Sequence, residues 1–293
     1  MANLKEVRSR ITSVGSTMQI TSAMKMVSAS KLRRAQNAVI ALRPYSKLLS
    51  KVISNIMEDN VELMESPYGR NSETDNVLLI VLTSNKGLCG GFNANIIKEV
   101  KKRIGEFSNQ DKYIKVDLMS FGKKSSEHFR KLNGCDLIKT QDSIWDELTF
   151  EKVTKITEEV MQLFVKGKYD KVEIIYNKFK NATTQIISRE EFLPLGSLND
   201  DQEQAINKNY IFEPSREEII ENIIPQALKI QMFRCMLDSF AAEHGARMTA
   251  MHKATDNAQS LLKELKLSYN KARQAAITNE IIEISSGAEA LNG

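Results

Sequence analysis

The chain has 293 residues, of which 42% are hydrophobic and 27% are charged, enough for one large or two ordinary domains. No apolar run reaches about 18 residues and no apolar segment opens the chain, which argues against a membrane-spanning helix and a signal peptide. The three cysteines and three histidines are widely spaced and include no Cys-x-x-Cys, which argues against a metal site and a disulfide framework.

The net charge of +4 is small, but the basic residues are unevenly distributed. Residues 1–57 contain ten lysines and arginines and a single acid, Glu6. Such a segment favours an acidic partner, which could be nucleic acid, an anionic membrane or an acidic protein surface. A solvated helix face is the equally ordinary alternative.

The first predicted element is a long helix over residues 3–57. Its apolar positions step by three and four, as in Leu4, Val7, Ile11, Val14 and Met18. Pro44 interrupts the pattern, but the apolar spacing resumes after it, so we expect a tolerated kink. The polar stretch 58–74 then predicts a linker.

From Asp75 the pattern changes to alternating strands and helices, which predicts an open α/β domain over residues 75–194. The expected strands are 77–82, 113–119, 137–138, 171–176 and 183–188, the last two forming an antiparallel pair. The expected helices are 95–104, 123–132 and 150–164.

After a polar connector at 199–209, a second long helix is predicted from Pro214 to about Gly287. At 1.5 Å per residue it would be on the order of 100 Å long, which exceeds the size of a globular domain. Much of this helix must therefore pack outside the core of its own domain. Its lysines and arginines exclude a membrane span.

The fold class expected is thus α/β: a long antiparallel two-helix coiled coil with an inserted open, Rossmann-like α/β domain. The domain boundaries are 1–58 for the N-terminal coiled-coil helix, 75–194 for the α/β domain and 214–287 for the C-terminal coiled-coil helix. If Met57 and Ser215 lie side by side, Met1 lies opposite Lys271, and about 15 residues of the second helix project alone. This tip is apolar and needs a socket. Its apolar residues are Ala275, Ala276, Ile277, Ile281, Ile282 and Ile284.

A glycine-rich loop, Thr83–Asn93, joins the first strand to its helix, where α/β folds often bind phosphate. The chain contains neither GxGxxG at this position nor a P-loop motif anywhere. We therefore prefer a tight turn in which glycines adopt positive φ. Cys89 could be activated at a helix start, but no histidine is near in sequence to act as its base.

Three blocks of sequence resemble one family, the gamma subunit of the F-type ATP synthase. The blocks are Arg8–Lys31, with Ile20-Thr21-Ser22-Ala23-Met24-Lys25-Met26 at its centre; Gly87-Leu88-Cys89-Gly90-Gly91-Phe92-Asn93; and Arg247-Met248-Thr249-Ala250-Met251 onward, ending in Ala272–Ala290. The resemblance spans nearly the whole chain and is to the bacterial form, because the cysteine insert of chloroplast members and a clear organelle presequence are missing.

The resemblance implies a central rotor stalk that couples proton translocation to ATP synthesis or hydrolysis. The implied partners are the alpha and beta subunits, with one gamma per hexamer, the epsilon subunit and the ring of c subunits. It implies no catalytic site, cofactor, metal or nucleic acid of its own. The implied location is peripheral, on the cytoplasmic side of the bacterial inner membrane, through the c ring.

The resemblance also implies roles for particular residues. Met24, Lys25, Arg247, Gln274 and Thr278 would contact the beta subunit. Lys25 is a departure, since some relatives carry an acid at that position. The tip residues would lie in a hydrophobic sleeve at the top of the alpha–beta hexamer. They are Ile277, Ile281, Ile282 and Ile284.

Two alternatives come from other classes of protein. The first is an α/β nucleotide-binding enzyme with coiled-coil oligomerisation arms, which would bind nucleotide or turn over a substrate by itself. The second is a basic coiled coil that binds nucleic acid with a steep salt dependence. The only aromatic residue of the basic helix is Tyr45, too few for base stacking.

Overall fold

The computed structural model describes residues 4–56, 67–69, 74–109, 114–131, 135–195 and 216–292. Contacts divide the chain into two compact units, residues 1–28 with 248–293 and residues 29–247. Most of the expected linker at 58–74, the connector at 199–209 and the expected helix start at Pro214 lie outside the described residues.

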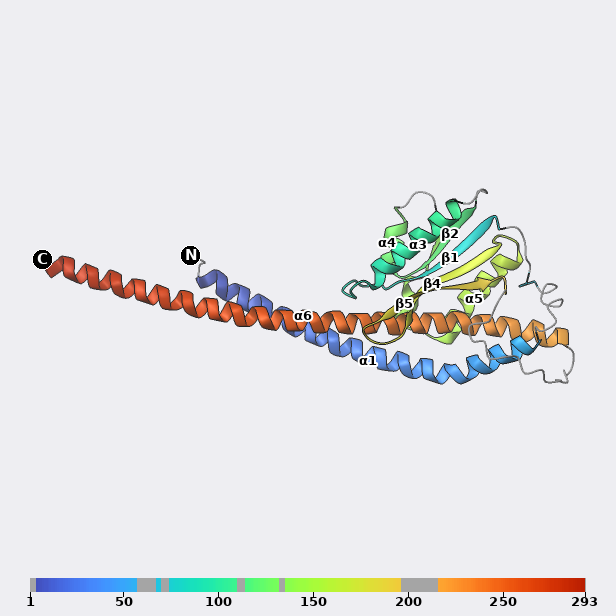
Figure 1. Cartoon of the computed structure of the whole chain (residues 1–293), viewed down its shortest axis with the longest axis horizontal. Helices are drawn as coiled ribbons and strands as arrows, with labels where there is room; N and C mark the ends of the chain where they lie inside the picture. The colour runs from blue at the N-terminus through green and yellow to red at the C-terminus, as the bar shows by residue number, and fades with distance from the viewer. Residues whose placement is uncertain are drawn as a thin grey trace. The chain divides into compact units, whose positions relative to one another are not determined.

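The second unit contains a five-stranded sheet with the order β3-β2-β1-β4-β5 (Figure 1). The strands are β1 (Asn76–Leu82), β2 (Lys115–Phe121), β3 (Asp136–Thr140), β4 (Lys171–Phe179) and β5 (Gln185–Leu193). β1 is parallel to β2 and β4, β2 is parallel to β3, and β5 is antiparallel to β4. The open α/β fold and the antiparallel last pair are confirmed.

The helices of this domain also follow the predicted order. They are α3 (Phe92–Ser108), α4 (Lys123–Phe129) and α5 (Phe150–Val165). A short 3₁₀ helix, η2 (Asp142–Trp145), was not predicted. Four residues are too few to display a helical period, so the sequence carries no signal for η2.

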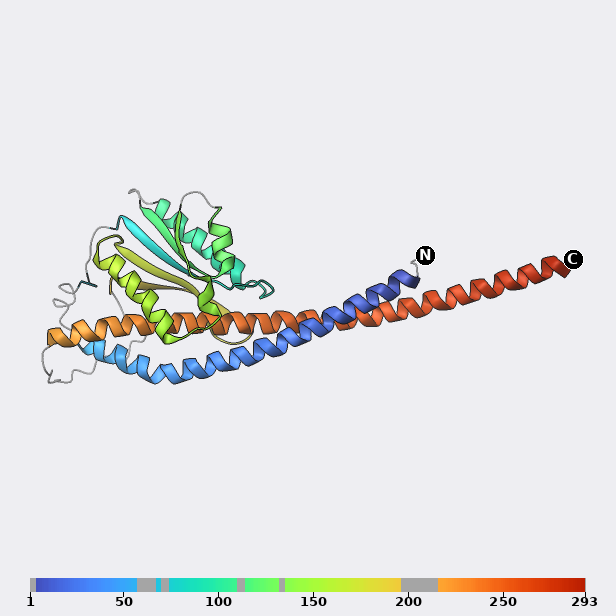
Figure 2. The same cartoon turned by 180° about the vertical axis from the view of Figure 1, so that it is seen from behind.

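The central strand β1 separates two hydrophobic clusters, because successive side chains of a strand point to opposite faces. Leu78, Ile80 and Leu82 face a cluster that includes Val153 and Val160 of α5. The alternate residues Val77, Leu79 and Val81 face a cluster that includes Ile96 and Val100 of α3. The sheet is therefore covered on both faces, with α3 on one and α5 on the other (Figures 1 and 2).

The long helix α6 (Arg216–Asn292) supplies part of the same core as α5. The α6 residues that join this cluster lie on one face of the helix, since each of the last four follows an earlier one by three or four positions: Ile224, Leu228, Met232, Cys235 and Met236. Hydrogen bonds to one carboxylate also link α6 to the sheet. The Glu190 carboxylate on β5 accepts hydrogen bonds from the Tyr176 hydroxyl on β4 and from Arg234 of α6, the latter at 2.6 Å.

An ion-pair network ties α3 to β4 and β5 on the opposite face. Arg103 donates two hydrogen bonds to Glu173, one of 2.7 Å, and a third of 2.8 Å to Glu106, which also binds Arg189. Glu173 is only 4% exposed. Burial raises the pKa of its carboxyl, but hydrogen bonding from Arg103 and the nearby Lys171 outweigh burial, and the pKa is lowered.

Replacing Arg103 with methionine is expected to lower the free energy of unfolding by about 3 kcal/mol, because the buried Glu173 carboxylate loses its bidentate partner. The measurement is denaturant unfolding of the purified chain. Lys152→Met is the control, since Lys152 pairs with Glu147 at the exposed surface, where such pairs contribute about 0–1 kcal/mol. Equal effects of the two substitutions would contradict this account of the network.

The helix α1 extends from Leu4 to Ile56 with Pro44 inside it. The expectation that the chain stays helical beyond this proline is confirmed. α1 and α6 both span the boundary between the two units.

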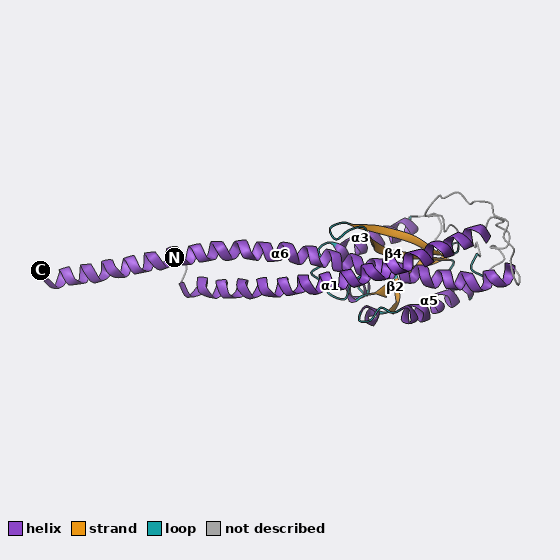
Figure 3. Ribbon diagram, turned by 90° about the horizontal axis from the view of Figure 1, so that it is seen from below, coloured by secondary structure: helices purple, strands orange, loops and turns teal. Residues whose placement is uncertain are grey.

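In the first unit, the ends of α1 and α6 run antiparallel (Figure 3). The Thr255 hydroxyl donates to the Thr21 hydroxyl at 2.9 Å. Counting equally along both helices from this pair places Leu4 opposite about residue 272, about four positions from the predicted register. All side chains of residues 273–288 are exposed. The predicted lone tip is therefore present in this unit, with a small error in register.

Candidate partner-binding surfaces

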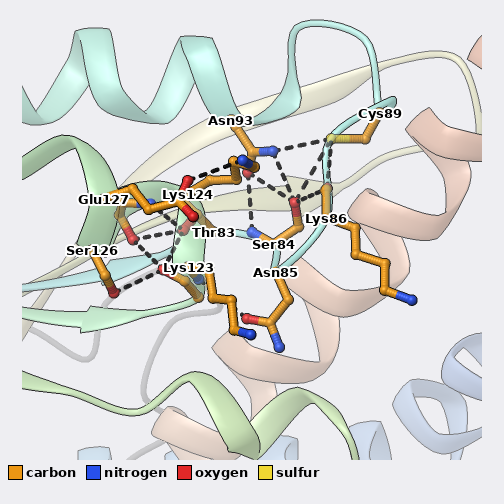
Figure 4. A network of polar contacts seen from close by, with 12 residues as sticks. Thr83, Ser84, Asn85, Lys86, Cys89, Asn93, Lys123, Lys124, Ser126 and Glu127 are labelled. Carbon is orange, nitrogen blue, oxygen red and sulfur yellow. Dashed lines mark hydrogen bonds and ion pairs between the residues drawn. The ribbon is translucent and has the colours of Figure 1, made fainter.

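The glycine-rich loop between β1 and α3 is organised by a buried polar network (Figure 4). The Ser84 amide donates to Asn93 Oδ1 at 3.0 Å, and the Ser84 hydroxyl donates to the Lys86 carbonyl at 2.7 Å. Asn93 Nδ2 in turn donates to Cys89 Sγ at 3.2 Å. Side chains from both ends of the loop thus supply hydrogen-bond partners for the Ser84 amide and the Lys86 carbonyl.

The loop turns tightly, as predicted. Gly90 has φ +60°, which glycine adopts without strain. Leu88 has φ +63°, which is uncommon for a residue with a branched side chain, and its side chain is 67% exposed. The loop is therefore held in a defined shape at some conformational cost.

The backbone amides at the start of α4, next to this loop, already have protein partners. The Lys123 amide donates to Asn85 Oδ1 at 3.1 Å, the Lys124 amide to the Ser84 carbonyl and the Ser125 amide to Thr83 Oγ1. These hydrogen bonds tie the start of α4 to the glycine-rich loop. In nucleotide-binding α/β folds the phosphate lies at the helix that follows the first strand, which here is α3. The bonds to α4 therefore support a structural role for the loop.

Cys89 is 2% exposed. Burial raises the pKa of its thiol, although a hydrogen bond with Ser84 and the charge of Arg247 act in the opposite direction. A thiol that stays protonated is a weak nucleophile. Cys89 is therefore better suited to packing than to catalysis.

The histidines and acids do not assemble a metal site within the described ranges. No three His, Cys, Asp or Glu side chains there are grouped closely enough to hold an ion. His244 is buried against Phe240, with ring centroids 4.4 Å apart. Burial, with Lys31 and Arg247 nearby, lowers the pKa of His244 to about 3, so the ring is neutral at physiological pH.

Four of the five expected contact residues lie in the first unit. Met24 and Lys25 are half-buried on α1, whereas Gln274 and Thr278 are exposed on α6. The Thr278 hydroxyl donates to the Gln274 carbonyl at 2.9 Å. Gln274 and Thr278 therefore occupy one exposed turn of helix, where a partner could reach both.

The expected tip residues are among the most exposed large apolar side chains of the described chain. The exposed fractions are 48% for Ile277, 61% for Ile281, 56% for Ile282 and 68% for Ile284. Apolar residues gathered on an unpaired helix end are a liability in water unless a partner covers them.

Arg247, the fifth expected contact residue, is only 7% exposed. It lies in the second unit and donates to the carbonyls of Lys86 and Gly87 and to the Glu243 carboxylate. Sequence analysis missed this use of Arg247 and missed Glu243 altogether. The spacing of four residues between a helical Glu and Arg was the available signal, because such pairs face each other.

These features define a class of protein. An antiparallel helix pair with an exposed apolar end is typical of a protein that acts by binding other proteins through its helices. Among the described helices, none combines the length and hydropathy needed to cross a bilayer.

Comparison with known sequences identifies the family. The family model described as ATP synthase matches residues 3–291. The ATP synthase gamma chain of Christiangramia forsetii is 53% identical over 293 residues and that of Flavobacterium johnsoniae is 52% identical, each covering the whole of both chains. The chain belongs to the ATP synthase gamma chain family.

Solved structures show the same fold. A chain of the central stalk and c ring of the Tetrahymena thermophila mitochondrial ATP synthase is 26% identical, with a TM-score of 0.56 over 80% of this chain and 99% of that one. A chain of the Euglena gracilis mitochondrial ATP synthase has a TM-score of 0.67 at 20% identity, covering 98% of this chain and 94% of that one.

Proposed function

We propose that this chain is the central rotor stalk of a bacterial F-type ATP synthase. The observation that carries the proposal is the 53% identity to an ATP synthase gamma chain along the full length of both chains. In this role the chain stands within a hexamer of alpha and beta subunits. It contacts the epsilon subunit and the c ring, and couples proton translocation to ATP synthesis or hydrolysis.

The stalk acts by mechanical coupling. Because a helix pair is asymmetric, each orientation favours a different set of conformations in the surrounding catalytic subunits. Rotation then shifts these conformational populations in turn, which requires only that the contacts differ between states. The chain needs no catalytic site of its own for this role. The packed loop at Ser84–Asn93 supports that view, because the side chains of Ser84, Cys89 and Asn93 hydrogen-bond one another and the loop backbone.

The contact residues fall into two groups under this proposal. The exposed isoleucines of the tip, Ile277, Ile281, Ile282 and Ile284, sit in the apolar sleeve of the hexamer. Gln274 and Thr278 form polar contacts with the beta subunit. Met24 and Lys25 face an acidic loop of that subunit, for which the positive charge of Lys25 is suited.

Arg247 is a weaker candidate for a beta contact, because its guanidinium is engaged by Lys86, Gly87 and Glu243. The proposed location is the cytoplasmic side of the bacterial inner membrane, reached through the c ring. Support for this location comes from the bacterial origin of the relatives at 52–53% identity.

Reconstitution tests the proposal. Purified alpha and beta subunits are mixed with and without the chain, and assembly is followed by native mass spectrometry while ATP hydrolysis is assayed. We expect one copy of the chain per six partners, faster hydrolysis and no turnover by the chain alone. A chain that stays free beside the subunits, or that hydrolyses ATP unaided, would overturn the proposal and favour the nucleotide-binding enzyme.

A further inference from the structure

Arg247 links α6 to the glycine-rich loop within the second unit. Its guanidinium donates to the Lys86 carbonyl at 3.1 Å and also to the Gly87 carbonyl. A third hydrogen bond of 2.5 Å joins it to Glu243, one helical turn earlier. One side chain of α6 therefore binds two consecutive carbonyls of the loop.

A small apolar cluster lies beside the hydrogen bonds of Arg247 and also joins the loop to α6. Cys89 and Phe92, at the end of the loop, form a buried cluster with Ala242 and Ala246 of α6. Small side chains on the helix let the loop approach closely. The thiol of Cys89 is 2% exposed as a result.

The hairpin between β4 and β5 meets the same turn of α6. A Cβ added to Gly245 would lie 3.2 Å from Ala182 Cα and 3.3 Å from Phe179 Cε2. Asn177 of β4 also donates to the Phe92 carbonyl at 3.2 Å. The loop and the hairpin are thus bound both to each other and to one turn of α6, the last before the first unit begins at Met248.

The Arg247–Glu243 pair is buried, which makes each partner depend on the other. Burial raises the pKa of Glu243, and the positive charges of Arg247 and Lys31 act against that rise. Without Arg247, the Glu243 carboxyl would be buried with only Lys31 nearby, and the Gly87 carbonyl would lose its Arg247 donor, whereas the Lys86 carbonyl would keep the Ser84 hydroxyl. The loop would then lose its polar link to α6 and be held there only by the packing of Cys89 and Phe92.

We propose that Arg247 is a positioning residue that fastens the Ser84–Gly91 loop to α6, so that the α/β domain and its segment of α6 turn as one body. The functional part of this inference rests on the rotor proposed above. α6 continues past Arg247 to Asn292, so torque entering or leaving the domain passes along it. The α6 residues Ile224–Met236 anchor the helix in the domain core farther back along the chain. A loose attachment at Arg247 would leave the last turn of α6 before Met248 free to twist relative to the loop.

The first test measures access to Cys89 in the full chain. Cys135 is half-buried and is replaced by serine in all variants, while Cys235 is fully buried and stays unreactive. The probe is dithiobis(nitrobenzoate). Arg247→Gln is expected to speed modification of Cys89 roughly 10- to 100-fold, because it removes the two hydrogen bonds that tie the loop covering the thiol to α6.

Arg189→Gln is the matched control for this test. It removes an arginine of the same domain that binds Glu99 and Glu106, away from the loop. We expect it to lower the melting temperature without exposing Cys89. An unchanged Cys89 rate in Arg247→Gln, or an equal rise in the control, would overturn the fastening role.

The second test uses the reconstituted complex and compares proton pumping with ATP hydrolysis. Arg247→Gln is expected to lower the number of protons pumped per ATP by at least about twofold while hydrolysis continues. Ala242→Leu keeps Arg247 but overpacks the cluster in which Cys89 and Phe92 contact α6. We expect the same loss of coupling, because the loop is again separated from the helix. If Arg247 acts only by touching the beta subunit, Ala242→Leu remains fully coupled, which would overturn the positioning role.

Failure of the rotor proposal has a different signature. In that case the wild-type chain does not join the alpha–beta hexamer, whatever the Cys89 rates. Failure of the present inference leaves wild-type assembly and coupling intact, with Cys89 still protected in Arg247→Gln or coupling unchanged in both variants.

Discussion

Gly122→Ala is expected to lower the free energy of unfolding by about 4 kcal/mol. Gly122 lies between β2 and α4 with φ +115° and ψ 138°. An added Cβ would lie 2.2 Å from the Thr83 carbonyl oxygen and 2.7 Å from its carbon. Both atoms belong to the backbone, so neither can rotate away.

Two costs combine in this estimate. A residue with a Cβ held at such a φ is strained by about 1–3 kcal/mol. Overpacking adds about 1–3 kcal/mol, because β1 would have to move away from β2 at the point where the Thr83 amide donates to the Phe121 carbonyl. In a domain of this size the two together predict a fall in melting temperature of roughly 10 °C.

The control is Gly105→Ala in α3 of the same domain. An added Cβ there meets nothing within 4 Å, and alanine favours a helix by about 1 kcal/mol over glycine. The two substitutions should therefore change the melting temperature in opposite directions, as measured by calorimetry on the full chain. A Gly122→Ala variant as stable as the wild type would contradict the close contact between Gly122 and Thr83.

Local patterns in the sequence were sufficient to predict the strands and α-helices and their order, but not the short helix η2. The run Val77–Leu82 is apolar at every position, which identified a strand buried on both faces. The spacing of apolar residues predicted both long helices. The register of the helix pair was predicted about four positions away from the observed Thr21–Thr255 contact. Counting from Met57 and Ser215 assumed that these residues are level, which no local pattern specifies.

Contacts between residues far apart in the chain could not be predicted in this way. The sequence identified Arg247 by resemblance as a contact to another subunit, whereas its hydrogen bonds reach 160 residues back to the glycine-rich loop. No local pattern shows that an added Cβ would meet the Thr83 backbone at Gly122 and nothing within 4 Å at Gly105. The roles of Arg247 and Gly122 depend on which distant backbone segment lies next to them, and that is determined only when the sheet is assembled.

Replacing Ile281 and Ile282 with aspartate is expected to leave the isolated chain as stable as the wild type and to weaken its assembly with the alpha–beta hexamer at least about 100-fold. Their side chains are 61% and 56% exposed, so the isolated fold gains little from them. Covering an isoleucine fully contributes about 1.5–3 kcal/mol. Covering the exposed parts of the two side chains contributes about 2–3.5 kcal/mol. Burying two aspartate carboxylates in an apolar site costs more, so the total is at least about 3 kcal/mol, or roughly two orders of magnitude in the dissociation constant.

The matched control is Glu280→Gln with Glu283→Gln, two exposed acids on the same turns of α6. It changes charge by the same amount in the opposite sense, without removing apolar surface. Native mass spectrometry across a range of chain concentrations gives the fraction of hexamers that hold one copy. If the tip enters an apolar sleeve, only the aspartate variant requires a higher concentration. If both variants bind as the wild type does, the tip is not the anchor, and the hexamer must hold the chain by the polar contacts at Gln274 and Thr278 and those on α1.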